Sequence, residues 1–168
     1  TALTQDQISL LWRLEKEPVL CFDGDAAGQK AALRALERAL PLLKPGYSLN
    51  FASLPSGQDP SSLLEGRNKD AFVRVLSHKK TLLEMLWEMF LARAGDVSTP
   101  ERRSLWEKNI HETLQTIADE GVRSHYRRFI SDKLFHHFRP AKFSKTPPKV
   151  LQSTPRVTAA IMRARVLL

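Results

Sequence analysis

Apolar residues in the first third of the chain follow two different periods. Between positions 26 and 43 they recur every three or four residues, the spacing of an amphipathic helix. Two short apolar runs flank this stretch, PVLCF at 18–22 and YSLNFASL at 47–54, and both are typical of strands. A strand, a helix and a second strand in this order predict two parallel strands joined by a crossover helix.

Helical periodicity dominates the rest of the chain, and no further strand is expected after Pro60. We expect short helices near 60–65 and 69–77, followed by three longer amphipathic helices that form a bundle. The sequence therefore predicts an α/β unit followed by an all-α unit. The longer helices are expected within 80–95, from a cap at Ser98 to Ile117, and within 121–138.

Charge is distributed unevenly between the two parts of the chain. Positions 1–120 hold 15 Lys and Arg against 17 Asp and Glu (net −2), whereas positions 121–168 hold 11 against 1 (net +10). A basic block of this kind is typical of nucleic-acid contact, but also of a solvated basic face or tail. Composition alone leaves both interpretations open.

Cysteine usage and hydropathy limit the class of protein. Cys21 is the single cysteine, and the five histidines show no zinc-ligand spacing, so we expect neither a disulfide nor a zinc site in this stretch. No apolar run approaches the length of a membrane span, and no segment resembles a signal peptide. These features predict a cytoplasmic protein.

Acidic residues follow each of the two predicted strands. Asp23 and Asp25 come directly after the first strand, and Asp59 follows the second. The carboxyl ends of parallel strands share one edge of a sheet, and two or three carboxylates there suit Mg²⁺. Helix capping by Asp25, and by Asp59 before Pro60, explains the same residues without a metal. Both interpretations stay open at this point.

Two other interpretations of the acidic loop are weaker. An EF-hand counted from Asp23 has Ala27 at the fifth position and Arg34 where a bidentate glutamate is required, so it is excluded. A phosphatase with an aspartyl nucleophile fits an Asp-x-Asp after a strand. However, the chain shows no later constellation of a lysine and paired aspartates to complete such a site.

Three segments in this order and spacing resemble one known family. The segments TALT, VLCFDGDAAGQKAALRAL and LPSGQDPSSLL are similar to the second half of the TOPRIM domain of bacterial DnaG-type DNA primases. The following FVRVL and LLEMLW stretches and the predicted helices are similar to the helical subdomain of the same family. The resemblance implies a partial TOPRIM domain at 1–66, the helical subdomain at 67–140, a basic proline-rich linker at 141–155 and the start of a helicase-binding domain at 156–168.

The resemblance also implies roles for individual residues. Asp23 and Asp25 match the family's metal-binding DxD motif, and Asp59 matches the first acid of its DPD motif, whereas Ser61 stands in place of the second acid. The glutamate of the family's EGxxD motif, its zinc-ribbon module and its basic subdomain have no counterpart in this sequence. We therefore expect a primase fragment that makes no primer by itself.

For the intact enzyme, the resemblance implies template-directed synthesis of short RNA primers. Its cofactor is Mg²⁺ or Mn²⁺, with zinc only in the module that has no counterpart here. Its partners are a single-stranded DNA template, ribonucleoside triphosphates and a DnaB-type replicative helicase. Alternatives are a TOPRIM nuclease or topoisomerase-like enzyme, and a non-catalytic module that binds nucleic acid or helicase. Candidate contacts to nucleotide or nucleic acid are Lys30, Arg34, Arg123, Arg127 and Arg128, although the solvated face of an amphipathic helix is the simpler explanation for the first two.

Overall fold

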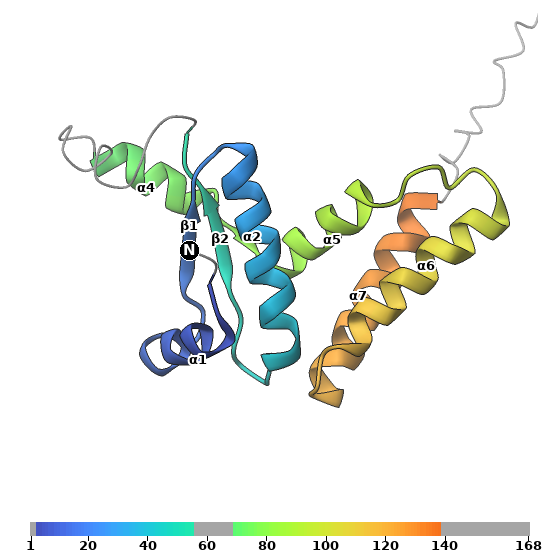
Figure 1. Cartoon of the computed structure of the whole chain (residues 1–168), viewed down its shortest axis with the longest axis horizontal. Helices are drawn as coiled ribbons and strands as arrows, with labels where there is room; N and C mark the ends of the chain where they lie inside the picture. Colours follow the sequence, from blue (N-terminus) through green and yellow to red (C-terminus); the bar gives the residue numbers. More distant parts are fainter. Residues whose placement is uncertain (1–2, 56–68, 139–168) are drawn as a thin grey trace, which may run out of the picture. The chain divides into compact units, whose positions relative to one another are not determined.

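The computed structural model describes residues 3–55 and 69–138, in which a small sheet is followed mainly by helices. Figure 1 shows the elements in chain order, and the described residues up to His137 belong to one compact unit. The elements are α1 (Gln5–Leu14), β1 (Val19–Phe22), α2 (Ala26–Ala39), the 3₁₀ turn η1 (Leu40–Leu42), β2 (Asn50–Ser53), α4 (Lys69–Ser77), β3 (Lys80–Thr81), α5 (Leu82–Ala92), α6 (Pro100–Gln115) and α7 (Glu120–Phe138).

Strands β1 and β2 are parallel, and α2 connects them as the hydrophobic pattern predicted. Leu20 lies opposite Phe51, and Phe22 lies opposite Ser53. Helix α2 contacts both strands and runs beside them (Figure 1). Its buried face consists largely of alanines, whose small side chains allow a helix to approach a sheet closely. These buried residues are Gly28, Ala32, Ala35, Leu36 and Ala39.

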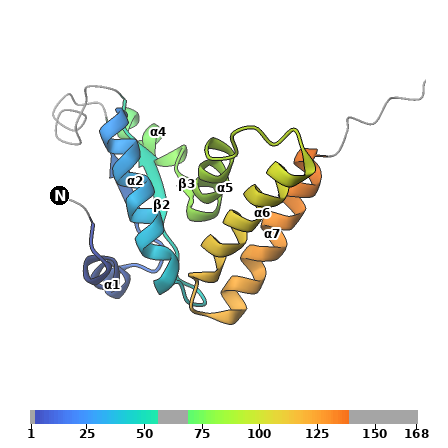
Figure 2. The same cartoon turned by 45° about the vertical axis from the view of Figure 1, so that its right-hand side comes forward.

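The expectation of no strand after residue 60 is wrong. Lys80 and Thr81 form β3, which is antiparallel to β2 and pairs with Phe51 and Asn50 (Figure 2). The backbone N–H of the next residue, Leu82, also donates to the Leu49 carbonyl at 3.0 Å. The sequence carries no signal for this strand because two exposed polar residues show neither alternation nor an apolar run.

The two parallel strands differ in burial. Three of the four residues of β2 are buried, whereas all four of β1 are half-buried. In the described part of the chain, β1 forms the edge of the sheet and β2 lies between β1 and β3. The buried Asn50 keeps its polar group satisfied, since its side-chain amide donates to the Glu17 carbonyl at 3.1 Å.

Helix starts follow capping rules, with one difference from the prediction. The capping box of Thr4 and Gln7 is present at the start of α1. Helix α6 is capped by Thr99 rather than by Ser98, because the Thr99 hydroxyl accepts from the Arg102 N–H and Pro100 occupies the first helical position. Pro100 indicates the start of α6 better than Ser98 does, because proline fits the first helical turn without losing a hydrogen bond.

Tryptophan side chains connect the helices of the second part. The indole N–H of the buried Trp106 in α6 donates to the Phe90 carbonyl in α5 at 2.9 Å. The rings of Trp87 and Trp106 lie 6.5 Å apart, and the ring of Trp87 meets His137 of α7 edge-on at 6.0 Å. These contacts show that α5 touches both later helices, while a closed three-helix bundle stays a prediction.

An ion pair and a hydrogen bond are among the contacts that connect the helical part to the α/β part. Arg93, the C-cap residue that follows α5, forms an ion pair with Glu37 of α2 at 2.7 Å. Tyr126 of α7 is hydrogen-bonded to the Ser48 side chain, and burial raises the pKa of the tyrosine to about 12. A half-buried tyrosine that keeps its proton is a structural contact between these parts.

Several predicted segments fall on residues that the structure does not describe. The helix expected near 60–65, the linker at 141–155 and the segment at 156–168 lie outside the described residues, and the proposed boundaries stay predictions. Among the helices of the described part, none is both long and apolar enough to cross a bilayer.

Candidate metal site at the end of the first strand

Asp23 and Asp25 lie where β1 ends and α2 begins, and both are exposed. Asp25 is the N-cap of α2, and its Oδ1 accepts a hydrogen bond from the Gly28 N–H at 2.7 Å. The capping interpretation of Asp25 is therefore confirmed. Capping uses one carboxylate oxygen and leaves the second for another ligand, so capping does not exclude a metal-binding role.

Close backbone packing determines the geometry of this junction. Gly28 is buried in the first turn of α2, directly against the backbone of Asp23. A Cβ atom built on Gly28 would lie 2.1 Å from the Asp23 carbonyl oxygen, a separation that real Cβ atoms essentially never show. The junction therefore requires glycine at position 28.

The donor atoms present suit a hydrated divalent cation. Two exposed carboxylates lie two residues apart, and Mg²⁺ in proteins is typically held by one or two carboxylates while water and substrate phosphates complete its shell. No group of three acidic, histidine or cysteine residues comes together among the residues that the structure describes. The third predicted ligand, Asp59, and Ser61 lie outside these residues, so their roles stay predictions.

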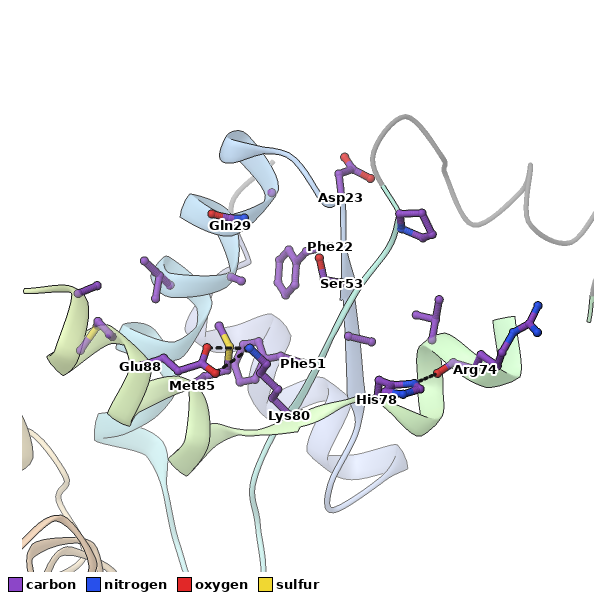
Figure 3. A pocket seen from close by; sticks show the side chains of 18 residues that line it. Phe22, Asp23, Gln29, Phe51, Ser53, Arg74, His78, Lys80, Met85 and Glu88 are labelled. Atoms are coloured by element: carbon purple, nitrogen blue, oxygen red, sulfur yellow. Dashed lines mark hydrogen bonds and ion pairs between the residues drawn. The ribbon is translucent and has the colours of Figure 1, made fainter. Parts of the chain in front are cut away.

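A cavity of about 760 Å³ borders Asp23. Figure 3 shows Asp23 at one end, with Phe22 and Ser53 below it and the ion pair of Lys80 and Glu88 further along. The rings of Phe22 and Phe51 are nearly parallel, with centroids 6.2 Å apart. The cavity is therefore mainly apolar, with charged groups at its ends. Other lining residues come from α2, α4, α5 and the turn after α4, among them Gln29, Arg74, His78, Met85 and Met89.

The predicted basic contacts differ in their surroundings. Arg123 donates to the Ile117 carbonyl at 2.9 Å and pairs with Glu120, and its side chain is only 19% exposed. These contacts give Arg123 a structural role at the start of α7. In contrast, Arg127 and Arg128 of α7 are exposed, as are Lys30 and Arg34 of α2.

The sequence alone does not reveal the cavity, and it reveals the role of Gly28 only in part. The cavity is lined by six elements that are distant in the sequence, so no local pattern marks it. Gly28 was recognisable as a site of close approach, because glycine is disfavoured inside helices unless packing requires it. That the approaching group is the backbone of Asp23 follows only from the folded structure.

Comparison with known proteins supports the same interpretation. Residues 1–52 match the Toprim domain model. The DNA primase of Rickettsia bellii is 32% identical over 155 residues, covering 92% of this chain and 26% of that protein. The DNA primase of Escherichia coli K12 is 34% identical over 134 residues, covering 80% of this chain and 23% of that protein. The chain thus spans about a quarter of the length of the curated relatives it matches.

Solved structures show the same similarity in three dimensions. A DnaG primase catalytic domain bound to single-stranded DNA has a TM-score of 0.69 and 32% identity, covering 79% of this chain and 42% of that chain. A DNA primase domain from Pseudomonas aeruginosa has a TM-score of 0.70 and 34% identity, covering 79% of this chain and 41% of that chain. The mixed α/β fold thus matches the DnaG catalytic core. The chain is homologous to part of the catalytic core of the bacterial DnaG-type DNA primases.

Proposed function

We propose that this chain supplies the metal-binding carboxylates of a primase that makes short RNA primers on single-stranded DNA. One observation carries the proposal: Asp23 and Asp25 are exposed together at the carboxyl end of β1, in a chain homologous to DnaG primases. The carboxyl end of the strands is where open α/β sheets bind their ligands. The DNA-bound relative supports a single-stranded template as the nucleic-acid partner.

The proposed reaction joins two ribonucleotides. A primer 3′-oxygen loses its proton and bonds to the α-phosphorus of a ribonucleoside triphosphate, and the bond between the α- and β-phosphates breaks to release pyrophosphate. When bound, Mg²⁺ or Mn²⁺ supplies activation of the 3′-oxygen and neutralises charge on the leaving group. Asp23 and Asp25 act as ligands and not as nucleophiles. Asp59 joins them by the sequence resemblance alone.

The remaining roles follow from exposure and charge. Lys30 and Arg34 on α2, and Arg127 and Arg128 on α7, are exposed cations that suit contact with phosphate groups. The helices that follow the sheet form the primase helical subdomain as a three-helix bundle. A DnaB-type helicase is the proposed partner of the intact protein, and the cytoplasm is its proposed compartment.

The function is tested in a chimera in which residues 1–138 replace the matching segment of the E. coli primase. We expect template-dependent incorporation of ribonucleotides, and its loss in the variants Asp23→Asn and Asp25→Asn. Glu84→Gln is a matched control, because Glu84 is an acidic residue in the first turn of α5 with a capping role. Equal activity of the Asp25→Asn chimera and the unaltered chimera would contradict the proposal.

Two further assays separate the alternative functions. A nuclease or topoisomerase-like enzyme would cleave DNA with Mg²⁺ in the absence of ribonucleotides. A binding module would show salt-sensitive DNA binding that survives both aspartate substitutions. We expect the 168-residue chain alone to make no primer, and primer synthesis by that chain would contradict this expectation.

A further inference from the structure

We propose that Gly28 is a positioning residue that holds both Asp23 and Asp25 in the arrangement needed for a divalent cation. The inference rests on the metal-binding function proposed above and adds to it a residue that carries no ligand atom. Gly28 contacts the two acidic residues in different ways, through its N–H and through its missing side chain. Each contact restricts one of the two carboxylates.

The N–H of Gly28 fixes Asp25. It donates to Oδ1 of Asp25 at 2.7 Å, a short distance for an N–H···O bond and typical of a charged acceptor. The bond orients the carboxylate at the end of α2, so that Oδ2 is the oxygen left for a cation. Hydrogen bonds of this kind to ligand groups reduce the reorganisation needed on metal binding.

The bare Cα of Gly28 determines the position of Asp23. A Cβ here would lie 2.1 Å from the carbonyl oxygen of Asp23, 2.8 Å from its carbonyl carbon and 2.9 Å from its nitrogen. All three are backbone atoms, which cannot rotate away as the end of a flexible side chain can. An alanine at position 28 therefore has to displace the backbone of Asp23 or the first turn of α2. Either movement changes the distance between the two carboxylates.

Two other glycines of the described part provide a contrast. Gly46 and Gly95 have positive φ values of 79° and 59°, and a Cβ on either would meet nothing within 4 Å. These residues serve turn conformation and contact no acidic group through a missing Cβ. Substitution at either position strains the backbone locally, so both are controls for a general loss of stability.

The first experiment leaves the protein unaltered. Mg²⁺ is titrated into the ¹⁵N-labelled 168-residue chain, and amide resonances are followed by NMR. We expect the Gly28 amide to shift together with those of Asp23 and Asp25, while the amides of Gly46 and Gly95 stay in place. Shifts at Asp23 and Asp25 without a shift at Gly28 would overturn the inference, and this result does not depend on whether a variant folds.

The second experiment measures Mn²⁺ affinity by electron paramagnetic resonance for Gly28→Ala, Gly46→Ala and Gly95→Ala, at a temperature where each is folded by circular dichroism. We expect Gly28→Ala to weaken binding by about tenfold or more, which is the effect typical of groups that orient metal ligands, and the two controls to bind as the unaltered chain does. If the role of Gly28 is purely structural, Gly28→Ala will melt at a lower temperature and bind Mn²⁺ with unchanged affinity. This result would overturn the inference. Absence of Mn²⁺ binding in the unaltered chain would instead overturn the proposed metal function itself, and with it the inference.

Discussion

Helices α2 and α5 both begin within a few residues of the end of a strand, and an acidic side chain takes part in capping each of them, but in different ways. At α5 the carboxylate of Glu84 accepts from the Thr81 N–H at 2.8 Å and from the Thr81 hydroxyl at 2.9 Å, while the Thr81 hydroxyl accepts from the Glu84 N–H. This is a reciprocal capping box in which the acidic group is engaged by the helix start.

The start of α2 leaves acidic groups available. Asp25 uses one oxygen for its cap, and Asp23 lies exposed beside the cavity. The first turn of α2 contains no acidic residue that would return a hydrogen bond to the cap. Both hydrogen bonds from Thr81 go to the same oxygen of Glu84, so each helix start leaves one carboxylate oxygen, and the start of α2 differs because Asp23 adds a second exposed carboxylate two residues before Asp25.

Added Mg²⁺ is expected to give the largest difference between the two junctions. At a free concentration one hundred times the dissociation constant, Mg²⁺ should raise the free energy of unfolding of the unaltered chain by about 2.7 kcal/mol. Asp25→Ser should lose this gain, and Glu84→Gln should keep it. Urea unfolding with and without Mg²⁺ measures both, and an unchanged gain in Asp25→Ser would remove the distinction between the junctions.

Loss of the capping box at α5 is expected to have the next largest effect. Thr81→Ala removes the hydroxyl that accepts from the Glu84 N–H and donates to its carboxylate. We expect a loss of about 1 to 2 kcal/mol in the free energy of unfolding, without any change in Mn²⁺ affinity. Thr81→Ser retains a hydroxyl and serves as the control. A drop in Mn²⁺ affinity in Thr81→Ala would show that the two junctions are coupled.

Two substitutions at Asp25 separate capping from metal binding. Asp25→Ala removes the acceptor for the Gly28 N–H and should cost about 1 kcal/mol of stability in the absence of metal, whereas Asp25→Ser keeps a capping oxygen and should stay within about 0.5 kcal/mol. Both should bind Mn²⁺ weakly, because neither carries a carboxylate. Stability is measured by urea unfolding in chelator, and full Mn²⁺ affinity in Asp25→Ser would assign Asp25 to capping alone.

Lowering the pH should destabilise the start of α5 through Glu84, and this is the smallest of the four expected effects. The hydrogen bonds from Thr81 hold the pKa of Glu84 below its ordinary value of 4.5. A carboxyl whose folded pKa is depressed stabilises the protein above the unfolded pKa, and this contribution disappears as the pH falls through the folded pKa. The melting temperature of the unaltered chain relative to Glu84→Gln should therefore fall as the pH is lowered from 6 to below 4. A difference that does not depend on pH would contradict this origin.

Local patterns were sufficient for the elements that carry strong periodicity. The alternation of strand and helix around Asp23, the capping box at Thr4 and the long amphipathic helices were predicted because each depends on neighbours within one or two turns. The start of α6 was misplaced by one residue, because Ser98 and Thr99 are both good caps and only Pro100 distinguishes them. Strand β3 was not predicted, because its two residues pair with β2 through the backbone and show no hydrophobic pattern in the sequence.

For the candidate site, the sequence by itself determined which groups are available: two carboxylates after an apolar strand, in a motif similar to that of the primases. Tertiary structure decided how each is used. The cavity beside Asp23 depends on segments brought together by folding, whereas the packing of Gly28 on Asp23 and the contacts of Arg123 with Ile117 and Glu120 depend on the folded path of the backbone within six residues. The physical reason is that residue type specifies which hydrogen bonds a group can make, whereas only the folded chain determines which of them are already made.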